Sequence, residues 1–363
     1  MAKSALAVVQ PGLEGLLQRE LGALGLRGQT VEGGVIFDAS TEALHKVHLH
    51  ARIPTRVWVR VGTFRATSLD ALARGVRALG WRPYLHRRQD LSVRVTTRSS
   101  RLRFRDRIAR KVEHAVCDAL RSGPSGRRPH QGAGLLVRVI DDQVEISVDA
   151  SGEPLYQRGW RRDVGRAPLR ENLAAAVLSL AGWRPDQPLL DPMCGSGTFC
   201  IEAATIAASR PPGQGRGFAF EAWPSHDRAA WARARQRSSP ADPGAPIVGS
   251  DRDRSVLDAA RANARRAGVA ARIGFEPRSV SELIAPAGPG LLVANPPWGE
   301  RIRGAEATWR ELGAALRGLS GWRIALLVPR MPLLRHLGIR LERRATFSAG
   351  GIRIAVCTGV VPG

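Results

Sequence analysis

Lysines, paired cysteines and long apolar runs are all scarce in this chain of 363 residues. The four cysteines, Cys117, Cys194, Cys200 and Cys357, include no Cys-x-x-Cys pair, so neither a disulfide framework nor a zinc site is predicted. No run approaches the roughly 20 apolar residues that cross a bilayer, and the apolar run at residues 4–9 is too short for a secretory signal. We therefore expect a cytoplasmic protein that holds no metal and enters no membrane.

Acidic residues are also few relative to basic ones. The chain has 55 lysines and arginines against 32 acids, a formal net charge of +23 and a pI near 11.5. Only Lys3, Lys46 and Lys111 are lysines. A GC-rich genome, which favours arginine codons, would explain why most basic residues are arginines, but not why basic residues outnumber acidic ones. A basic surplus of this size favours a polyanionic partner, most often nucleic acid, over a merely basic surface.

The first 155 residues have the pattern of two small α+β modules. Residues 1–61 carry alternating patterns, with strands at 5–9, 35–37 and 57–61 and helices at 12–24 and 38–50. Residues 62–155 carry strands at 91–95, 135–139 and 144–148 and a helix at 101–121. Six arginines crowd the start of that helix: Arg98, Arg101, Arg103, Arg105, Arg107 and Arg110. Most charge runs are solvated faces, but few acids neutralise this one, so we expect it to contact phosphates.

Residues 156–363 change to longer apolar elements. Short buried strands are expected at 189–190, 247–248, 291–293 and 324–328, and helices at 173–180, 255–267 and 308–319. Strands that alternate with helices predict an α/β fold, a mostly parallel sheet with helices on both faces. The run at 352–356 is expected to add an antiparallel edge strand, and residues 210–246 to form an insertion.

A glycine-containing loop follows the strand at 189–190 and leads into a helix: Asp191-Pro192-Met193-Cys194-Gly195-Ser196-Gly197-Thr198. Such a turn lies at the carboxyl end of the sheet, where open α/β folds bind ligands, and its glycines let a ligand approach the backbone. A nicotinamide fingerprint is not matched, because Cys200 replaces the third glycine and the next strand-end acid is far more than roughly 20 residues away. The carboxylate of Asp191 suits a cationic ligand such as S-adenosylmethionine.

The next strand-end acid is Asp251, after the strand at 247–248. A carboxylate there can accept hydrogen bonds from both ribose hydroxyls of an adenosine ligand. The alternative role, capping the helix at 255–267, fits Asp253 better.

The strand at 291–293 ends at Asn295-Pro296-Pro297-Trp298. The prolines stiffen the backbone, so the segment holds a side-chain amide, proline carbonyls and a flat aromatic ring in a rigid loop. An amine on a nucleobase needs acceptors for its N–H groups and a surface for its ring. The alternative is ordinary turn chemistry, with the tryptophan capping a core.

In order and spacing, these motifs resemble class I S-adenosylmethionine-dependent RNA methyltransferases that carry a THUMP domain. More narrowly, they resemble the guanine-N2 methyltransferase family of large-subunit (23S) ribosomal RNA. Further segments are similar to the start of its catalytic domain and to its insertion: Arg158-Gly159-Trp160-Arg161, Ala167-Pro168-Leu169-Arg170-Glu171, and Gly217-Phe218-Ala219-Phe220-Glu221 with Trp223-Pro224, Asp227 and Trp231. The resemblance covers nearly the whole chain.

This resemblance implies a Rossmann-like class I methyltransferase domain at 156–363, preceded by a ferredoxin-like module at 1–61 and a THUMP domain at 62–155. It implies catalytic roles for Asn295, Pro296, Pro297 and Trp298, and RNA contact by Arg301. It places the S-adenosylmethionine site at Asp191, Cys194, Gly195, Gly197, Thr198, Asp251, Ser279 and Asn295. Two departures stand out. Trp298 replaces the usual tyrosine, and Ser279 stands where relatives often place an acid for the adenine amine, a loss for which Glu282 would compensate.

The implied activity is methyl transfer to the N2 amine of a guanine in structured RNA, with ribosomal RNA favoured. One alternative is a guanine-N2 methyltransferase of transfer RNA, because THUMP domains are commonly associated with transfer RNA ends. Another is adenine-N6 methylation of nucleic acid, because the Asn295–Trp298 segment serves both bases. A third is a non-catalytic RNA-binding or ribosome assembly factor, against which the intact glycine loop argues.

Overall fold

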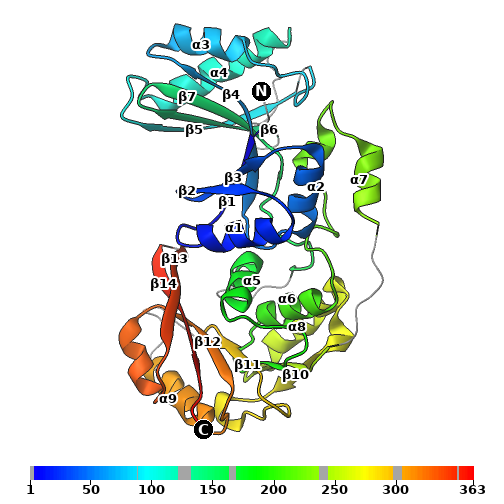
Figure 1. Ribbon diagram of the computed structural model, residues 1–363, viewed down its shortest axis with the longest axis vertical. Coiled ribbons are helices and arrows are strands. Elements are labelled where there is room, and N and C mark those ends of the chain that lie inside the picture. Colours follow the sequence, from blue (N-terminus) through cyan, green and yellow to red (C-terminus); the bar gives the residue numbers. More distant parts are fainter. Residues whose placement is uncertain are drawn as a thin grey trace.

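The computed structural model describes residues 4–87, 89–121, 132–162, 169–236, 244–296, 305–349 and 351–363. These residues form two sheets of seven strands each, one in the N-terminal half and one in the C-terminal half. The two halves lie at opposite ends of an elongated molecule (Figure 1). The two predicted α+β modules therefore share one sheet, and the predicted α/β region forms the other.

The N-terminal sheet has the order β2-β3-β1-β4-β7-β6-β5. Its first part consists of β1 (Ser4–Val8), α1 (Glu14–Ala23), β2 (Gly28–Val31), β3 (Gly34–Asp38), α2 (Thr41–His50) and β4 (Arg56–Arg65). Its second part consists of α3 (Leu69–Arg77), β5 (Leu91–Arg98), α4 (Arg105–Ala119), β6 (Ala133–Ile140) and β7 (Gln143–Asp149). Each predicted strand and helix of residues 1–155 is confirmed, and β2 and α3 were not predicted.

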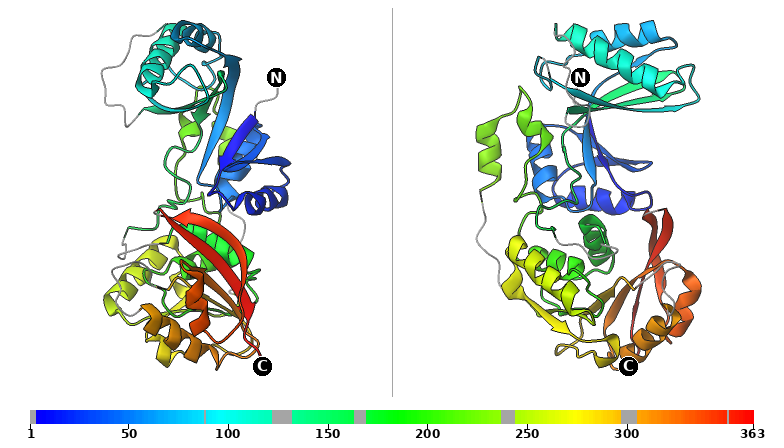
Figure 2. Two further views of the ribbon diagram at one scale, coloured as in Figure 1. Left: turned by 90° about the vertical axis from the view of Figure 1, so that its left-hand side faces the viewer. Right: turned by 180° about the vertical axis from the view of Figure 1, so that it is seen from behind.

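The strand β4 belongs to both parts of this sheet. Its first residues pair with β1, as in Ala5 with Val59, and residues from Trp58 to Arg65 pair with β7. In Figure 2 it runs from the first part of the sheet into the second. The predicted boundary between residues 61 and 62 therefore lies inside one continuous strand.

The helix predicted from residue 101 begins only at Arg105. The carboxylate of Asp142 explains the delay, because its Oδ1 accepts hydrogen bonds from the Arg101 backbone N–H and the Ser100 hydroxyl, both at 2.9 Å. These bonds hold residues 100–101 in a loop against the β6–β7 turn.

The C-terminal sheet has the order β10-β9-β8-β11-β12-β14-β13. Its strands are β8 (Leu189–Asp191), β9 (Ile247–Asp251), β10 (Ile273–Pro277), β11 (Leu291–Ala294), β12 (Arg323–Val328), β13 (Glu342–Ala349) and β14 (Ile352–Val360). The antiparallel strand β14 is present as predicted, but its position at the edge is wrong. It pairs with β12 on one side and β13 on the other, so β13 forms the edge.

Helices cover both faces of this sheet, as the alternation of strands and helices predicts. On one face α5 (Glu171–Leu180), α6 (Thr198–Ala207) and α8 (Arg254–Ala267) pack on alternate strand residues such as Leu189 and Val293. On the other face α9 (Ala305–Leu316) packs Trp309 on the intervening residues, such as Leu190 and Leu292.

A buried ion network joins the two halves. Glu202 of α6 accepts a hydrogen bond from Nη1 of Arg52 at 2.8 Å, and Nη2 of Arg158 lies 3.6 Å from the same carboxylate oxygen. Arg52 also donates to the Arg210 carbonyl at 2.6 Å. The amide of Asn172 in α5 donates to the Ile53 carbonyl at 3.1 Å.

The predicted insertion packs against the N-terminal half. It contains η1 (Ala219–Ala222) and α7 (Arg228–Ala234), and α7 lies beside α2 in Figure 1. The ring of Phe220 lies 5.6 Å from that of His45 in α2 and 5.1 Å from that of Trp231. The insertion is therefore a second connection between the halves.

Within the described ranges, no helix is both long and apolar enough to cross a membrane.

Candidate active site

The acidic and amide side chains predicted to form the site lie at one edge of the C-terminal sheet. Asp191 ends β8 and Asp251 ends β9, and β8 pairs with β9 through Asp191 and Gly249. Asn295 follows β11, which is the other neighbour of β8. Because parallel strands present their carboxyl ends at the same edge, the three residues lie side by side. This edge faces the N-terminal half. Because β14 runs antiparallel to β12, its last residues lie at the opposite edge of the sheet, and the C-terminus that follows them lies at the end of the molecule away from the N-terminal half (Figure 1).

The glycine loop is hydrogen-bonded to the end of β9. The Gly195 N–H donates to Oδ2 of Asp251 at 3.0 Å, and the Cys194 N–H donates to the Ser250 carbonyl at 2.9 Å. Oδ1 of Asp251 accepts from the Asp253 N–H at 3.0 Å. The Asp253 side chain caps α8 by accepting from the Ser255 N–H at 2.9 Å, so the predicted division of roles between the two acids is confirmed for Asp253.

Two glycines are needed in this loop for different reasons. Gly195 has a φ of +52°, and a Cβ there would meet no atom within 4 Å, so the space beside it is open to a ligand. Gly197 has a φ of +84°, and a Cβ there would lie 3.0 Å from Cζ of Phe275. Gly195 therefore leaves room outside the protein, whereas Gly197 lets α6 pack closely on β10.

Two acidic side chains lie at this edge of a strongly basic protein. Asp191 is 1% exposed and its Oδ1 accepts one hydrogen bond, from the Met193 N–H at 3.2 Å. Burial raises its pKa well above the usual range, and the nearby charge of Asp251 raises that pKa further. No described lysine or arginine forms an ion pair with either acid. A positively charged ligand would provide a counter-charge for both carboxylates, and these two carboxylates fit the amino and sulfonium groups of S-adenosylmethionine.

Cys194 and Thr198 have protein partners in this arrangement. Cys194 is buried with its Cβ beside Gly249, and burial raises the pKa of its thiol well above the usual range, so the thiol stays neutral. The Thr198 hydroxyl accepts a hydrogen bond from Nη2 of Arg161 at 2.8 Å. Cys194 lies in the loop and Thr198 begins α6, and the predicted contact of both residues with the cofactor stays a prediction.

Ser279 follows β10 at the same edge, since Pro277 pairs with Asp251. Its N–H and its hydroxyl both donate to Oε2 of Glu282, at 3.0 and 2.8 Å. These bonds lower the pKa of the Glu282 carboxyl. The serine and the glutamate expected to compensate for the missing acid thus lie together.

The Asn295 side chain is partly buried and Pro296 is buried at the end of β11. Pro297, Trp298 and Arg301, which were predicted to take part in catalysis or RNA contact, lie outside the described residues.

The six predicted RNA-contacting arginines are all exposed, from Arg98 at the end of β5 through the following loop to the start of α4. In the described chain only Arg101 of the six forms an ion pair, with Asp142 at 3.7 Å. Phe104, between them, is 69% exposed, with the Arg107 guanidinium 5.9 Å from its ring centre. This surface lies at the opposite end of the molecule from the C-terminal sheet (Figure 1).

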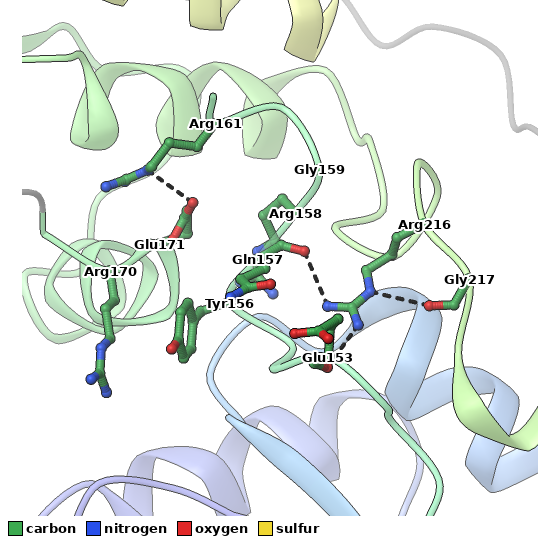
Figure 3. A pocket seen from close by; sticks show the side chains of 10 residues that line it. All are labelled: Glu153, Tyr156, Gln157, Arg158, Gly159, Arg161, Arg170, Glu171, Arg216 and Gly217. Atoms are coloured by element: carbon green, nitrogen blue, oxygen red, sulfur yellow. Dashed lines mark hydrogen bonds and ion pairs between the residues drawn. The ribbon is translucent and has the colours of Figure 1, made fainter. Parts of the chain in front are cut away.

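One cavity near the glycine loop was not predicted. A cavity of about 740 Å³ lies at the junction of the halves, lined by Tyr156, Arg158, Arg161, Arg170, Glu171 and Arg216 among others (Figure 3). Arg161 connects it to the glycine loop through Thr198. The signal that could have found it is the run of arginines between residues 158 and 170, directly before the first helix of the α/β region.

Comparison with known proteins agrees with this geometry. The family model "RMKL-like, methyltransferase domain" matches residues 158–334, and the model "RlmL ferredoxin-like domain" matches residues 4–58. A Listeria monocytogenes protein named as a predicted N6-adenine-specific DNA methylase is 30% identical, with a TM-score of 0.88, over 98% of this chain and 96% of that one.

Two further structures are similar over almost their whole length. SMU.472, crystallised with S-adenosylhomocysteine (SAH), is 28% identical, with a TM-score of 0.90, over 100% of this chain and 99% of that one. TrmN from Thermus thermophilus is 25% identical, with a TM-score of 0.75, over 98% of each chain. The chain therefore belongs to the RlmL-like family of class I methyltransferases, and its cofactor is S-adenosylmethionine.

Proposed function

We propose that the protein methylates the N2 amine of a guanine in structured RNA, with 23S ribosomal RNA as the favoured substrate. One observation carries the proposal. Asn295 and Pro296 follow β11 at the sheet edge that also holds Asp191 and Asp251, so acceptors for a base amine adjoin the cofactor site. The exposed, mostly unneutralised arginines around α4 support an RNA partner.

In this proposal the cofactor site is formed by Asp191, Gly195, Gly197, Asp251 and the Ser279–Glu282 pair. Asp191 faces the positive groups of the cofactor. Asp251 uses the lone pairs left by its two backbone hydrogen bonds to accept from the ribose hydroxyls. Gly195 leaves space for the ligand beside the loop.

The target guanine is flipped out of its stack into the site. The Asn295 side-chain oxygen and the Pro296 carbonyl accept the two N–H bonds of the amine and turn the nitrogen lone pair toward the incoming methyl group. Bound S-adenosylmethionine supplies that methyl group from its sulfonium. The residues accelerate the reaction mainly by orienting the amine for in-line attack, and the amine proton is lost after the N–C bond forms. Trp298 stacking on the base, contact of Arg301 with RNA, and a THUMP domain at residues 62–155 belong to the same proposal.

Substitution of Asn295 by alanine tests this assignment. We expect Asn295→Ala to bind RNA normally but to lose methyl transfer by about 100-fold or more, because positioning of the reacting atoms is removed. Tritium transfer to unmodified 23S ribosomal RNA measures turnover, and equilibrium dialysis with SAH measures any change in cofactor affinity. Near-normal turnover would refute the role of Asn295.

Adenine-N6 methylation is the second candidate, because the Listeria monocytogenes relative is named as a predicted N6-adenine-specific DNA methylase. Mass spectrometry of the nucleosides after reaction distinguishes the two. Methylguanosine supports the proposal, and methyladenosine, or its deoxy form from a DNA duplex, would replace it.

A further inference from the structure

The cavity at the junction of the two halves is large enough for a ligand and is linked by a hydrogen bond to the helix that follows the glycine loop. Its volume of about 740 Å³ is within the roughly 300–1,000 Å³ of small-ligand sites. Arg161 lines it and donates to Thr198, the first residue of α6. Arg170 and Glu171, at the start of α5, line the same cavity (Figure 3).

Three of the four arginines that line the cavity are held by protein groups. Arg158 is 5% exposed and lies beside Glu202, and it donates to the Leu155 carbonyl at 2.7 Å. Arg161 pairs with Glu171 at 3.0 Å. Arg216 donates to the carbonyls of residues 151, 153, 154, 157 and 217 at 2.6–3.4 Å. Their N–H groups are therefore largely used within the protein.

Arg170 differs from these three. It is exposed, and its guanidinium lies 4.9 Å from the ring centre of Tyr156. Within the part of the chain that the structure describes, the Arg170 side chain makes no hydrogen bond and no ion pair. Stacking on the tyrosine orients the planar group and leaves its N–H edges available. Figure 3 shows the two side chains together at one end of the cavity.

The charge of the cavity favours an anion. Among the described carboxylates, none lies within ion-pair distance of Arg216. Burial lowers the pKa of Arg216 to about 10, which still leaves it cationic at neutral pH. Glu153 also lines the cavity, and its charge raises the pKa of Arg216. Glu171 is neutralised by Arg161, so the two charges of Arg170 and Arg216 exceed the one of Glu153.

We infer that Tyr156 and Arg170 form a phosphate-binding subsite for the RNA strand beside the target guanine. The inference rests on the proposed RNA substrate. Arg170 donates two N–H groups to one phosphodiester, the bidentate geometry that guanidinium favours. A phosphate held there fixes the strand beside the flipped base, so the pair positions the substrate without touching the reacting atoms.

The test compares Arg170→Gln with Arg317→Gln, a matched loss of an exposed arginine that follows α9, outside the cavity. Binding of in-vitro-transcribed 23S ribosomal RNA is measured against salt concentration, together with the KM and kcat for that RNA. We expect Arg170→Gln to weaken RNA binding by about 10-fold or more. Its slope of log affinity against log salt should fall by about 0.7–0.9, one phosphate contact. The kcat and the SAH affinity should stay unchanged, as should the thermal midpoint.

Two more variants separate the roles of the pair. Tyr156→Ala removes the stacking surface and should reproduce the loss, whereas Arg170→Lys should restore part of the salt slope but not the bidentate affinity. An unchanged slope in Arg170→Gln, or a change in SAH affinity in its place, would overturn the inference. Absence of RNA binding by the unsubstituted protein would instead refute the proposed function, so the two failures are distinguishable.

Discussion

Removal of the carboxylate at Glu202 should destabilise the whole protein. Its side chain is 1% exposed and lies between Arg52 of the N-terminal half and Arg158 of the connecting segment. In Glu202→Gln the shape of the side chain is kept and its charge is lost. Both guanidinium groups then stay buried without a carboxylate, and Nε of Arg158 already lacks a hydrogen-bond partner.

The expected loss is large for a single substitution. Breaking a buried ion pair by removing one partner costs about 3–5 kcal/mol, because the remaining charge is desolvated and unpaired. For domains of this size each kcal/mol lowers the thermal midpoint by about 2–4 °C. We therefore expect Glu202→Gln to lower the midpoint by about 6–20 °C.

Differential scanning calorimetry measures this shift, with Glu42→Gln as the control. Glu42 forms a 2.8 Å ion pair with Lys46 on α2, but its side chain is 77% exposed, so its loss should change the midpoint little. Since Glu202 joins α6 to the N-terminal half, the transition should also broaden or split. A midpoint equal to that of the Glu42 variant would refute this account of the junction.

Two further predictions concern the glycine loop and pH. Gly197→Ala should lower the thermal midpoint, because its Cβ would lie 3.0 Å from Cζ of Phe275 at a φ of +84°. Gly195→Ala should mainly weaken SAH binding, measured by titration calorimetry. If both variants changed the thermal midpoint and the SAH affinity equally, the open space would be wrongly assigned to Gly195. Burial lowers the pKa of His48 to about 3, below its unfolded value of roughly 6.5. The neutral, buried His48 therefore contributes fully to the free energy of unfolding above about pH 6.5. That contribution is lost by about 1.4 kcal/mol per pH unit as the pH falls toward about 3. Denaturant unfolding at pH 7.5 and 5 measures this loss, and equal free energies of unfolding would contradict a buried, neutral His48.

The position of the site could be predicted from the sequence because it depends on local order along the chain. Asp191, Asp251 and Asn295 each follow a short apolar run, and parallel strands bring such positions to one edge. The apolar runs themselves are recognisable because central strands are buried on both faces. The chemical roles of these residues stay predictions, since they depend on a ligand.

Other features could not be read from local patterns. The edge strand β13 has the sequence Glu-Arg-Arg-Ala-Thr-Phe-Ser-Ala, in which charges interrupt the alternation, as is common for edges. In β4 the register shifts between Arg60 and Gly62, so the alternation of apolar residues breaks at Val61 and the sequence pattern predicts that the strand ends there. The contact of Arg52 with Glu202 joins residues far apart in the chain and becomes visible only in the folded protein.

The shared strand β4 determines how the protein can be divided. A fragment that ends at residue 61 would keep the pairing of β4 with β1 but would lose β7 and residues 62–65 of β4 itself. The strand would then expose a row of unpaired N–H and C=O groups, which pairs readily with other chains and leads to aggregation. A fragment that begins at residue 62 would carry the complementary defect. We therefore expect that the smallest N-terminal fragment to stay soluble on its own contains the complete seven-stranded sheet, whose two edges are β2 and β5.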